Sequence, residues 1–486
     1  RNTAPPPSPA GLQGFWRKGK APKRKAHLWK QVFVGDGSRI GESETAMQKI
    51  AIRHLGPVKE FTSDLLRMNL LIGEQATGKS TICKSVYFFR LIKEEIIAYL
   101  YDIATDRSME PDNRLPRVLN RKIKEVFLEL FGVSWYLDDK LHMRYDYAEE
   151  IYIQVSLSGE KKYLDVRYSP ELNSRLLALE DELAARRQDA GRMDFSFVVQ
   201  ERERMHKEIR NRVNDIFRDF LSTYYIPAGR QLLVLLSRQK TKIDYDSIDL
   251  VNRRFMQFNE SIQAHFDRGM GKVHEHFPLP ERDFAAAEMA QELIRSLKGD
   301  YRSTKAGEYF IVDKTQRVPI NYASSGQQEL LWLLNQLYIL LLRQECAFVI
   351  IEEPEAHIYP TLQKMVLEFI TEFTNINKSK ALVTTHSPYT LTVANVLHYS
   401  GRLARIIPGA AGDKAFQEIL PAGKWIDPEQ FTAWKLEQDG SVQPLVDVEY
   451  EDLRSSLIDD VSDEVERLYS KLYYYEVGHE ENRRQE

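Results

Sequence analysis

Hydrophobic and polar positions follow two different rhythms along the chain, and these rhythms separate candidate strands from candidate helices. Short apolar stretches at 49–55 and 68–73 are typical of strands. The stretch that begins at Lys79 repeats its apolar residues at near-helical spacing to beyond Ile96. From Tyr309 onward, strand and helix signals alternate once more. This alternation predicts an α/β fold.

The pattern between these two parts is different. Alternating runs at 150–157 and 162–168, separated by Ser158-Gly159, predict antiparallel hairpins. Residues 170–222 and 246–298 have a helical pattern, and the first of these segments is highly charged. No heptad is sustained over three repeats, so we do not expect a long coiled coil. The middle of the chain is therefore predicted to be hairpins followed by helices.

The first 46 residues have a composition of their own. They open with a proline-rich stretch and carry no acid before Asp36. Their basic residues include Arg17, Lys18, Lys20, Lys23, Arg24, Lys25 and Lys30. Such a segment cannot bury enough apolar surface to fold by itself. We interpret it as a flexible tail, or as an artefact of where the chain was cut or translated, with Met47 as the natural start. A nucleic-acid-binding arm is the alternative.

Composition narrows the class of protein. The chain has 486 residues, 43% of them hydrophobic and 28% charged, which is ordinary for a soluble globular protein. Its net charge of −4 means that any nucleic-acid site must be a local patch. Its two cysteines exclude a disulfide framework, and no signal peptide opens the chain. The longest apolar run, 330–342, is too short and too polar to span a bilayer. We expect a cytoplasmic protein without membrane association.

The strongest motif matches G-x-x-x-x-G-K-[ST] in full, after an apolar strand and before a helix. Its residues are Gly73, Glu74, Gln75, Ala76, Thr77, Gly78, Lys79, Ser80 and Thr81. Glycines let backbone N–H groups wrap a phosphate, and the helix N-terminus favours its charge. Lys79 would hold the β- and γ-phosphates, and the Ser80 hydroxyl would bind Mg²⁺. The motif predicts an ATP site with a magnesium ion.

A second motif, Ala347-Phe-Val-Ile-Ile-Glu-Glu-Pro-Glu355, is a buried strand that ends in acids. At the tip of a parallel strand, these acids would face the P-loop. Glu352 is placed to hold Mg²⁺ through water, because a glutamate is one methylene longer than the aspartate common at this position. Glu353 is placed to take a proton from the attacking water. The alternative is that the acids merely end a strand.

Two further motifs bring in a family resemblance. Ser324-Ser-Gly-Gln-Gln-Glu329 precedes the apolar helix that leads into the acidic strand, and it resembles the signature of ABC/SMC ATPases. Ser325, Gly326 and Gln327 carry the match, while a serine replaces the first glycine of the family pattern. In the same order, His386 of Ala381-Leu-Val-Thr-Thr-His-Ser-Pro388 resembles the switch histidine that senses the γ-phosphate. We find no clear Q-loop residue.

The stretches around 352–360 and 384–388 resemble a narrower group, the OLD-like ATPases, whose relatives include the ATPase subunits of anti-phage systems such as Septu and PARIS. The resemblance implies that Glu355, Ala356 and His357 form the turn that meets a partner subunit. Arg230, in Tyr224-Tyr-Ile-Pro-Ala-Gly-Arg230, either approaches the nucleotide or pairs with a nearby acid. After His386 we find no arrangement of acids like the Toprim nuclease domain of OLD proteins. Asp459, Asp460 and Asp463 fall in a stretch with a helical pattern.

The resemblance implies a P-loop NTPase head of ABC/SMC type with an inserted antiparallel-β and helical region. We predict a first head lobe at 47–135, the insertion at 136–305 and a second lobe at 306–486. One head would supply the P-loop and another the signature, in a homodimer or higher homo-oligomer. We expect an ATPase that works as a sensor or scaffold switch in anti-phage defence with a separate, nuclease-like effector. The alternatives are a DNA-repair ATPase whose insertion grips nucleic acid, and an ATP-dependent clamp with little turnover.

Overall fold

The structure is a computed structural model that describes residues 47–105, 115–132, 138–157, 164–189, 195–237, 248–277, 284–313, 316–446 and 453. These residues belong to one compact unit, Ser43–Glu486. The predictions for residues 1–46 and for Asp459, Asp460 and Asp463 lie outside the described residues.

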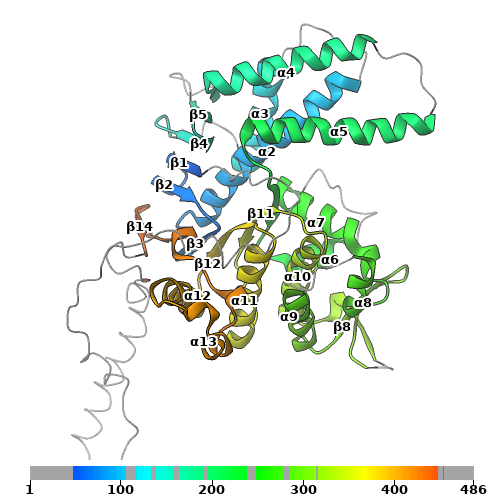
Figure 1. Cartoon of the computed structure of the whole chain (residues 1–486), viewed down its shortest axis with the longest axis vertical. Helices are drawn as coiled ribbons and strands as arrows, with labels where there is room; N and C mark the ends of the chain where they lie inside the picture. The colour runs from blue at the N-terminus through cyan, green and yellow to red at the C-terminus, as the bar shows by residue number, and fades with distance from the viewer. Residues whose placement is uncertain are drawn as a thin grey trace, which may run out of the picture. The chain divides into compact units, whose positions relative to one another are not determined.

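A six-stranded, mostly parallel sheet forms the centre of the fold (Figure 1), in the order β14-β13-β3-β12-β11-β7. All neighbouring strands are parallel except β14, which is antiparallel to β13. The strands are β3 (Met68–Gly73), β7 (Ser222–Ile226), β11 (Ala347–Glu352), β12 (Lys380–Thr385), β13 (Phe431–Leu436) and β14 (Val442–Pro444). The predicted α/β fold of P-loop type is confirmed, with β3 leading into the phosphate-binding loop and α2 following it.

The central strands are apolar because both faces of the sheet are covered. One face packs against helices α7, α9, α10, α11 and α12 through Leu70, Ile72, Val349, Ile351 and Val383. The other face packs against α2 through Leu71, Phe348, Ile350 and Leu382. Successive residues of each strand therefore serve two separate cores, as the two-residue period of a strand requires.

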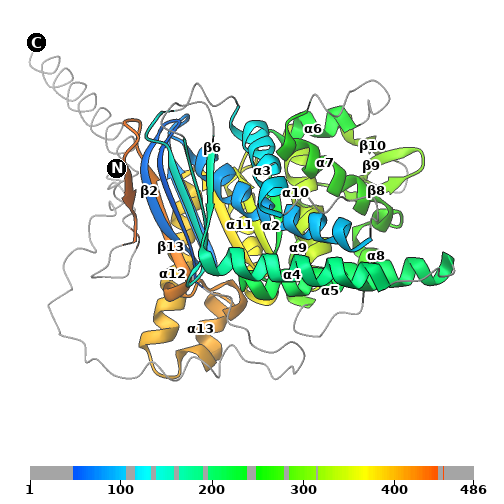
Figure 2. The ribbon, with the colours of Figure 1, turned by 90° about the horizontal axis from the view of Figure 1, so that it is seen from above.

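A second, antiparallel sheet covers the far side of α2 (Figure 2), in the order β2-β1-β4-β5-β6. Its strands are β1 (Gln48–Leu55), β2 (Val58–Leu65), β4 (His142–Ala148), β5 (Ile151–Leu157) and β6 (Leu164–Tyr168). The predicted hairpins are present, and they extend the sheet that β1 and β2 begin. The segment predicted as an insertion, 136–305, thus contributes β4–β6 to this sheet and β7 to the central sheet.

Helices fill the remaining layers. They are α2 (Lys79–Thr105), α3 (Leu115–Phe131), α4 (Pro170–Asp189), α5 (Phe195–Phe217), α6 (Arg230–Ser237), α7 (Leu250–Ile262), α8 (Met270–Val273), α9 (Phe284–Ser296), α10 (Ser325–Leu342), α11 (Pro360–Ile376), α12 (Pro388–Ile406) and α13 (Lys414–Ile419). A small antiparallel sheet of β8 (Asp300–Thr304), β9 (Gly307–Ile311) and β10 (Arg317–Pro319) lies beside α9. Within the described ranges, no helix is long and apolar enough to cross a membrane.

Helices α4 and α5 form a charged hairpin against α2 (Figure 1). Arg212 of α5 donates two hydrogen bonds to Glu182 of α4, at 2.7 and 2.6 Å. The hairpin joins α2 through Tyr99, whose hydroxyl donates to Glu180 Oε1 at 2.6 Å. The charged stretch predicted to be helical is thus a pair of helices that is fastened to the helix following the P-loop.

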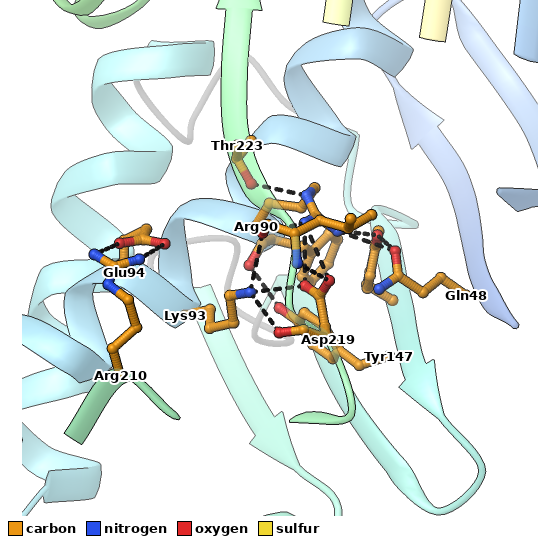
Figure 3. Close-up of polar contacts among 11 residues, drawn as sticks. Gln48, Arg90, Lys93, Glu94, Tyr147, Arg210, Asp219 and Thr223 are labelled. Atoms are coloured by element: carbon orange, nitrogen blue, oxygen red, sulfur yellow. Dashed lines mark hydrogen bonds and ion pairs between the residues drawn. The ribbon is translucent and has the colours of Figure 1, made fainter. Parts of the chain in front are cut away.

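A buried charged triad ties α2 to the entry of β7 (Figure 3). Arg90 and Lys93 of α2 both pair with Asp219, at 3.1 and 3.0 Å, and all three side chains are at most 1% exposed. Arg90 also donates to Thr223 Oγ1 at 2.8 Å and to Gln48 Oε1 at 3.0 Å. One arginine therefore links the central sheet, α2 and the antiparallel sheet, and buried charges of this kind are stable only when paired.

Candidate active site

The loop between β3 and α2 is tightly walled by its neighbours. Gly78 has a φ of +106°, a left-handed conformation that favours glycine. A Cβ at Gly78 would lie 2.7 Å from Val58 Cγ2, and a Cβ at Gly73 would lie 2.4 Å from the Leu436 carbonyl oxygen. The start of β2 and the end of β13 thus fix the course of the loop, and the two glycines of the motif are required by space as well as by conformation.

Lys79, the first residue of α2, is turned onto its own loop. Its Nζ donates hydrogen bonds to the carbonyl oxygens of Gly73 at 2.7 Å and Glu74 at 2.6 Å. Burial lowers the pKa of Lys79, and the charge of Glu353 is the largest effect opposing that shift. The next residue, Ser80, is exposed. The ammonium group is therefore held against the backbone of the loop, and the next residue in the chain is open to solvent.

Strand β11 ends in two glutamates with different surroundings. Glu352 is 8% exposed, and its Oε2 accepts a hydrogen bond from the Ala228 amide at 3.3 Å. Its Oε1 is buried without a hydrogen-bond partner in the described part of the chain. Glu353 has a φ of +44°, an uncommon conformation for a residue with a side chain. Its amide donates to the Thr384 carbonyl oxygen at 3.0 Å, which anchors the turn to β12.

His386 follows β12 directly and joins the acidic turn to the P-loop. Its Nε2 lies 3.0 Å from Glu353 Oε1, and its Nδ1 lies 3.4 Å from Lys79 Nζ. The structure therefore brings together Lys79, Glu353 and His386, which the sequence assigned to one catalytic site. They meet because β3, β11 and β12 are adjacent and parallel, so that their carboxyl ends share one edge of the sheet.

Arg230 holds the acidic turn from behind. Its side chain is fully buried, and its guanidinium donates to the carbonyl oxygens of Glu352 at 2.7 Å and Glu353 at 2.9 Å. Arg230 Nε also pairs with Glu329 Oε2 at 3.2 Å. Burial lowers the pKa of Arg230, and the charge of Glu329 is the main effect opposing that shift. Of the two roles considered for Arg230, pairing with a nearby acid is the one observed.

The signature segment begins α10 and packs on the turn after β11. Ser324 caps the helix, and Gln327 Oε1 accepts a hydrogen bond from the Ser324 amide at 2.8 Å. Gln327 Nε2 donates to the Leu297 carbonyl oxygen at 2.5 Å, so its side chain is engaged within its own chain. A Cβ at Gly326 would lie 2.6 Å from the His357 carbonyl oxygen. The role of Ser325, Gly326 and Gln327 in binding nucleotide stays a prediction.

The donors at this edge fit a cation that arrives with a nucleotide. Across the described ranges, no group of three or more His, Cys, Asp or Glu side chains could hold a metal ion. The hydroxyl of Ser80, an exposed residue, and the carboxylate of Glu352 carry oxygen atoms of the kind that Mg²⁺ prefers as ligands.

Two features of the site were not predicted from the sequence. One is Glu329, whose two carboxylate oxygens accept hydrogen bonds from the amides of Arg230 at 3.1 Å and Gln231 at 3.0 Å, at the N-terminus of α6. The other is the side chain of Glu355, which points back to β12 and accepts from Thr385 Oγ1 at 2.5 Å. The glutamate at the end of the signature segment and the repeated acids after β11 were the available signals.

Comparisons with known proteins point to an ATPase-type domain. Residues 236–391, about a third of the chain, match the family described as an AAA ATPase domain. This match includes the signature segment, the two glutamates and His386, and it begins after the P-loop. The curated proteins include none that matches the chain.

Among solved structures, the chain is similar to SMC head domains. For the SMC head bound to the C-winged helix domain of ScpA, identity is 13%, coverage is 72% of this chain and 92% of that chain, and the TM-score is 0.35. For the SMC head domain from Thermotoga maritima, identity is 12%, coverage is 72% of this chain and 92% of that chain, and the TM-score is 0.32. The third structure is the Smc head domain with an extended coiled coil, bound to the C-terminal domain of ScpA and derived from Pyrococcus furiosus. Here identity is 10%, coverage is 82% of this chain and 95% of that chain, and the TM-score is 0.36.

Proposed function

We propose that this chain binds and hydrolyses Mg-ATP as an ABC/SMC-like ATPase, and that ATP joins two copies head to head. The observation that supports this most directly is the meeting of Lys79, Glu353 and His386 at one edge of the central sheet. Lys79 would hold the phosphates, Glu353 would take a proton from the attacking water, and His386 would lie beside the γ-phosphate.

The magnesium ion would be held by Ser80 and, directly or through water, by Glu352. When bound, it would neutralise charge on the β- and γ-phosphate oxygens. The chain's own groups do the rest. Arg230 fixes the backbone carbonyls of both glutamates, and Glu353 is held by Thr384 and faces His386. Catalysis would then consist of positioning and of charge stabilisation.

The second half of each site would come from another copy. Ser325, Gly326 and Gln327 begin α10 beside the turn that contains His357, and Ser325 is only partly buried. In a head-to-head dimer they would close over the nucleotide held by the P-loop of the partner. Binding would favour the closed pair and hydrolysis would release it, so ATP would drive a two-state switch.

Such a switch suits a sensor or scaffold in bacterial anti-phage defence that works with a separate, nuclease-like effector. This part of the proposal rests on the resemblance of the stretches around 352–360 and 384–388 to OLD-like ATPases. The inserted segment at about 140–300 would sense or carry the partner.

The test is Glu353→Gln, which keeps the shape of the side chain but removes the base. We expect the variant to bind ATP with near-native affinity, to lose turnover by about 10²–10⁴-fold, and to accumulate as a dimer. Light scattering with and without Mg-ATP measures the dimer, and phosphate release measures turnover. Glu60→Gln, a change at an exposed glutamate of β2, is the control. Native turnover in Glu353→Gln would remove Glu353 as the base, and a wild-type chain that binds ATP without releasing phosphate would favour the clamp.

A further inference from the structure

The carboxylate of Glu355 is directed into its own chain rather than outward. Glu355 is 9% exposed, and its Oε1 accepts two hydrogen bonds. One comes from Thr385 Oγ1 at 2.5 Å, and the other comes from the backbone amide of His386 at 2.9 Å. A single oxygen atom therefore holds both the last residue of β12 and the histidine that follows it.

Thr385 extends this hold into the next helix. Its Oγ1 donates to Glu355 and accepts a hydrogen bond from the Ser387 amide at 2.9 Å. Ser387 caps α12, and its own hydroxyl donates to Gln363 Oε1 at 2.7 Å. The direction in which the chain leaves β12, and hence the direction of the His386 side chain, is set by hydrogen bonds that begin at Glu355.

These contacts close a ring that contains the catalytic pair. The backbone runs from Glu353 through Pro354 to Glu355, and Glu355 binds the amide of His386. The imidazole of His386 then returns to Glu353, with 3.0 Å between Nε2 and Oε1. Because the ring is short, a change at Glu355 shifts the position of His386 relative to Glu353 without removing either group.

We propose that Glu355 is a positioning residue for ATP hydrolysis, acting through His386. This inference rests on the proposed ATPase function. It also assigns the Glu355 side chain to the site of its own chain, whereas the family resemblance implied a role for this turn in meeting a partner subunit. Hydrogen bonds to the His386 amide and the Thr385 hydroxyl are the means by which it acts.

The test compares two substitutions at Glu355. Glu355→Ala removes the acceptor, so we expect kcat to fall by about 100-fold, the scale of a misplaced catalytic group, with KM for ATP changed less than about twofold. Glu355→Gln keeps a carbonyl oxygen at Oε1 and should retain kcat within about fivefold. A third variant, Thr385→Val, removes the hydroxyl with little change in shape and should also lower kcat with KM retained.

A double-mutant cycle separates positioning from general damage. If Glu355 acts through His386, then Glu355→Ala combined with His386→Ala should be no slower than His386→Ala alone. Thr392→Val, a change at an exposed threonine of α12, is the matched control for Thr385→Val. Multiplying effects of Glu355→Ala and His386→Ala, or a loss of kcat in Glu355→Gln equal to that in Glu355→Ala, would overturn the inference.

The same measurements distinguish this inference from the proposed function. If wild-type protein releases no phosphate, the proposed ATPase function is wrong. If wild type turns over and His386→Ala turns over normally, the role assigned to His386 is wrong. If His386→Ala is slow while Glu355→Ala and Thr385→Val are both as fast as wild type, the proposed function stands and the role of Glu355 is wrong. Should Glu355→Ala fail to fold, Thr385→Val still decides between these outcomes.

Discussion

Lys79 Nζ lies 3.4 Å from His386 Nδ1, so the phosphate-binding loop and the end of β12 meet through their side chains. In this arrangement Lys79 Nζ also donates hydrogen bonds to two carbonyl oxygens of its own loop. A triphosphate would offer the same ammonium group charged oxygens in place of neutral carbonyls. Binding of ATP would therefore exchange weaker hydrogen bonds of Lys79 for stronger, charge-assisted ones.

Lys79→Ala removes this exchange. We expect ATP affinity to fall by about 100-fold or more, because each charge-assisted hydrogen bond contributes about 1.5–3 kcal/mol. Titration with a fluorescent ATP analogue measures the loss. Lys59→Ala, a change at an exposed lysine of β2, should bind ATP normally. Unchanged affinity in Lys79→Ala would mean that the loop is not the phosphate site.

Gly326→Ala tests the contact between the signature helix and the turn after β11. Its Cβ would lie 2.6 Å from the His357 carbonyl oxygen, so the start of α10 or the turn has to move. We expect ATP affinity to be retained and turnover to fall by about tenfold or more, because about 1 Å of misplacement is costly in a catalytic assembly. Gly412→Ala, where a Cβ has open space, is the control. Equal turnover in the two variants would show that this contact does not affect catalysis.

The buried triad predicts a large stability effect for Asp219→Asn. Although burial opposes the shift, the charges of Arg90 and Lys93 hold the pKa of Asp219 well below its usual range. Removing the carboxylate leaves two buried cations short of their partner, which costs about 3–5 kcal/mol. Urea unfolding followed by tryptophan fluorescence measures the difference. Asp165→Asn, at an exposed ion pair with Arg167, should change stability by less than about 1 kcal/mol.

The sign of the pH dependence at Asp219 follows from its depressed pKa. Its stabilisation is fully present above the pKa of the unfolded chain, about 3.9. Below that pH the unfolded state takes up a proton that the folded state does not, so the stabilisation declines as the pH falls. The gap between wild type and Asp219→Asn should therefore narrow below about pH 4. A gap that stays constant on acidification would contradict this account.

Lys380, at the start of β12, makes the stability of the fold depend on pH in the alkaline range. Burial, followed by the charge of Arg90, lowers its pKa to about 8, and its Nζ donates to the Leu65 carbonyl oxygen at 2.8 Å. Between about pH 8 and about pH 10.4 the unfolded chain holds a proton that the folded chain has lost. Stability should thus rise with pH across this window. Lys380→Met should flatten the rise, and Lys364→Met, at an exposed lysine, should leave it unchanged.

The parts of the site that could be predicted are those whose residues lie in one short sequence motif. The P-loop, the acids after β11 and His386 each follow an apolar strand, and parallel strands bring their carboxyl ends to one edge. The pairing of Arg230 with Glu329 joins residues 99 positions apart, and no local pattern announces it. The hydrogen bond between Glu355 and the His386 amide was not predicted, for a related reason. In the sequence Glu355 is one of several acids in the turn, and its partner Thr385 lies 30 positions further on.

The fold shows the same division. Alternating residues predicted the hairpin of β5 and β6, because a strand with one buried face has a two-residue period. That period does not say which sheet a hairpin joins. The pairing of β1 with β4, such as Lys49 with Asp146, and the place of β7 beside β11 are set by packing around α2.

Helix α2 has 27 residues, which makes it about 40 Å long. Its first residue is Lys79, and Tyr99 near its other end is bonded to the α4–α5 hairpin. A tilt of about 5° around its first turn corresponds to a displacement of about 3.5 Å at its far end. One continuous helix thus connects the lysine of the P-loop to the α4–α5 hairpin.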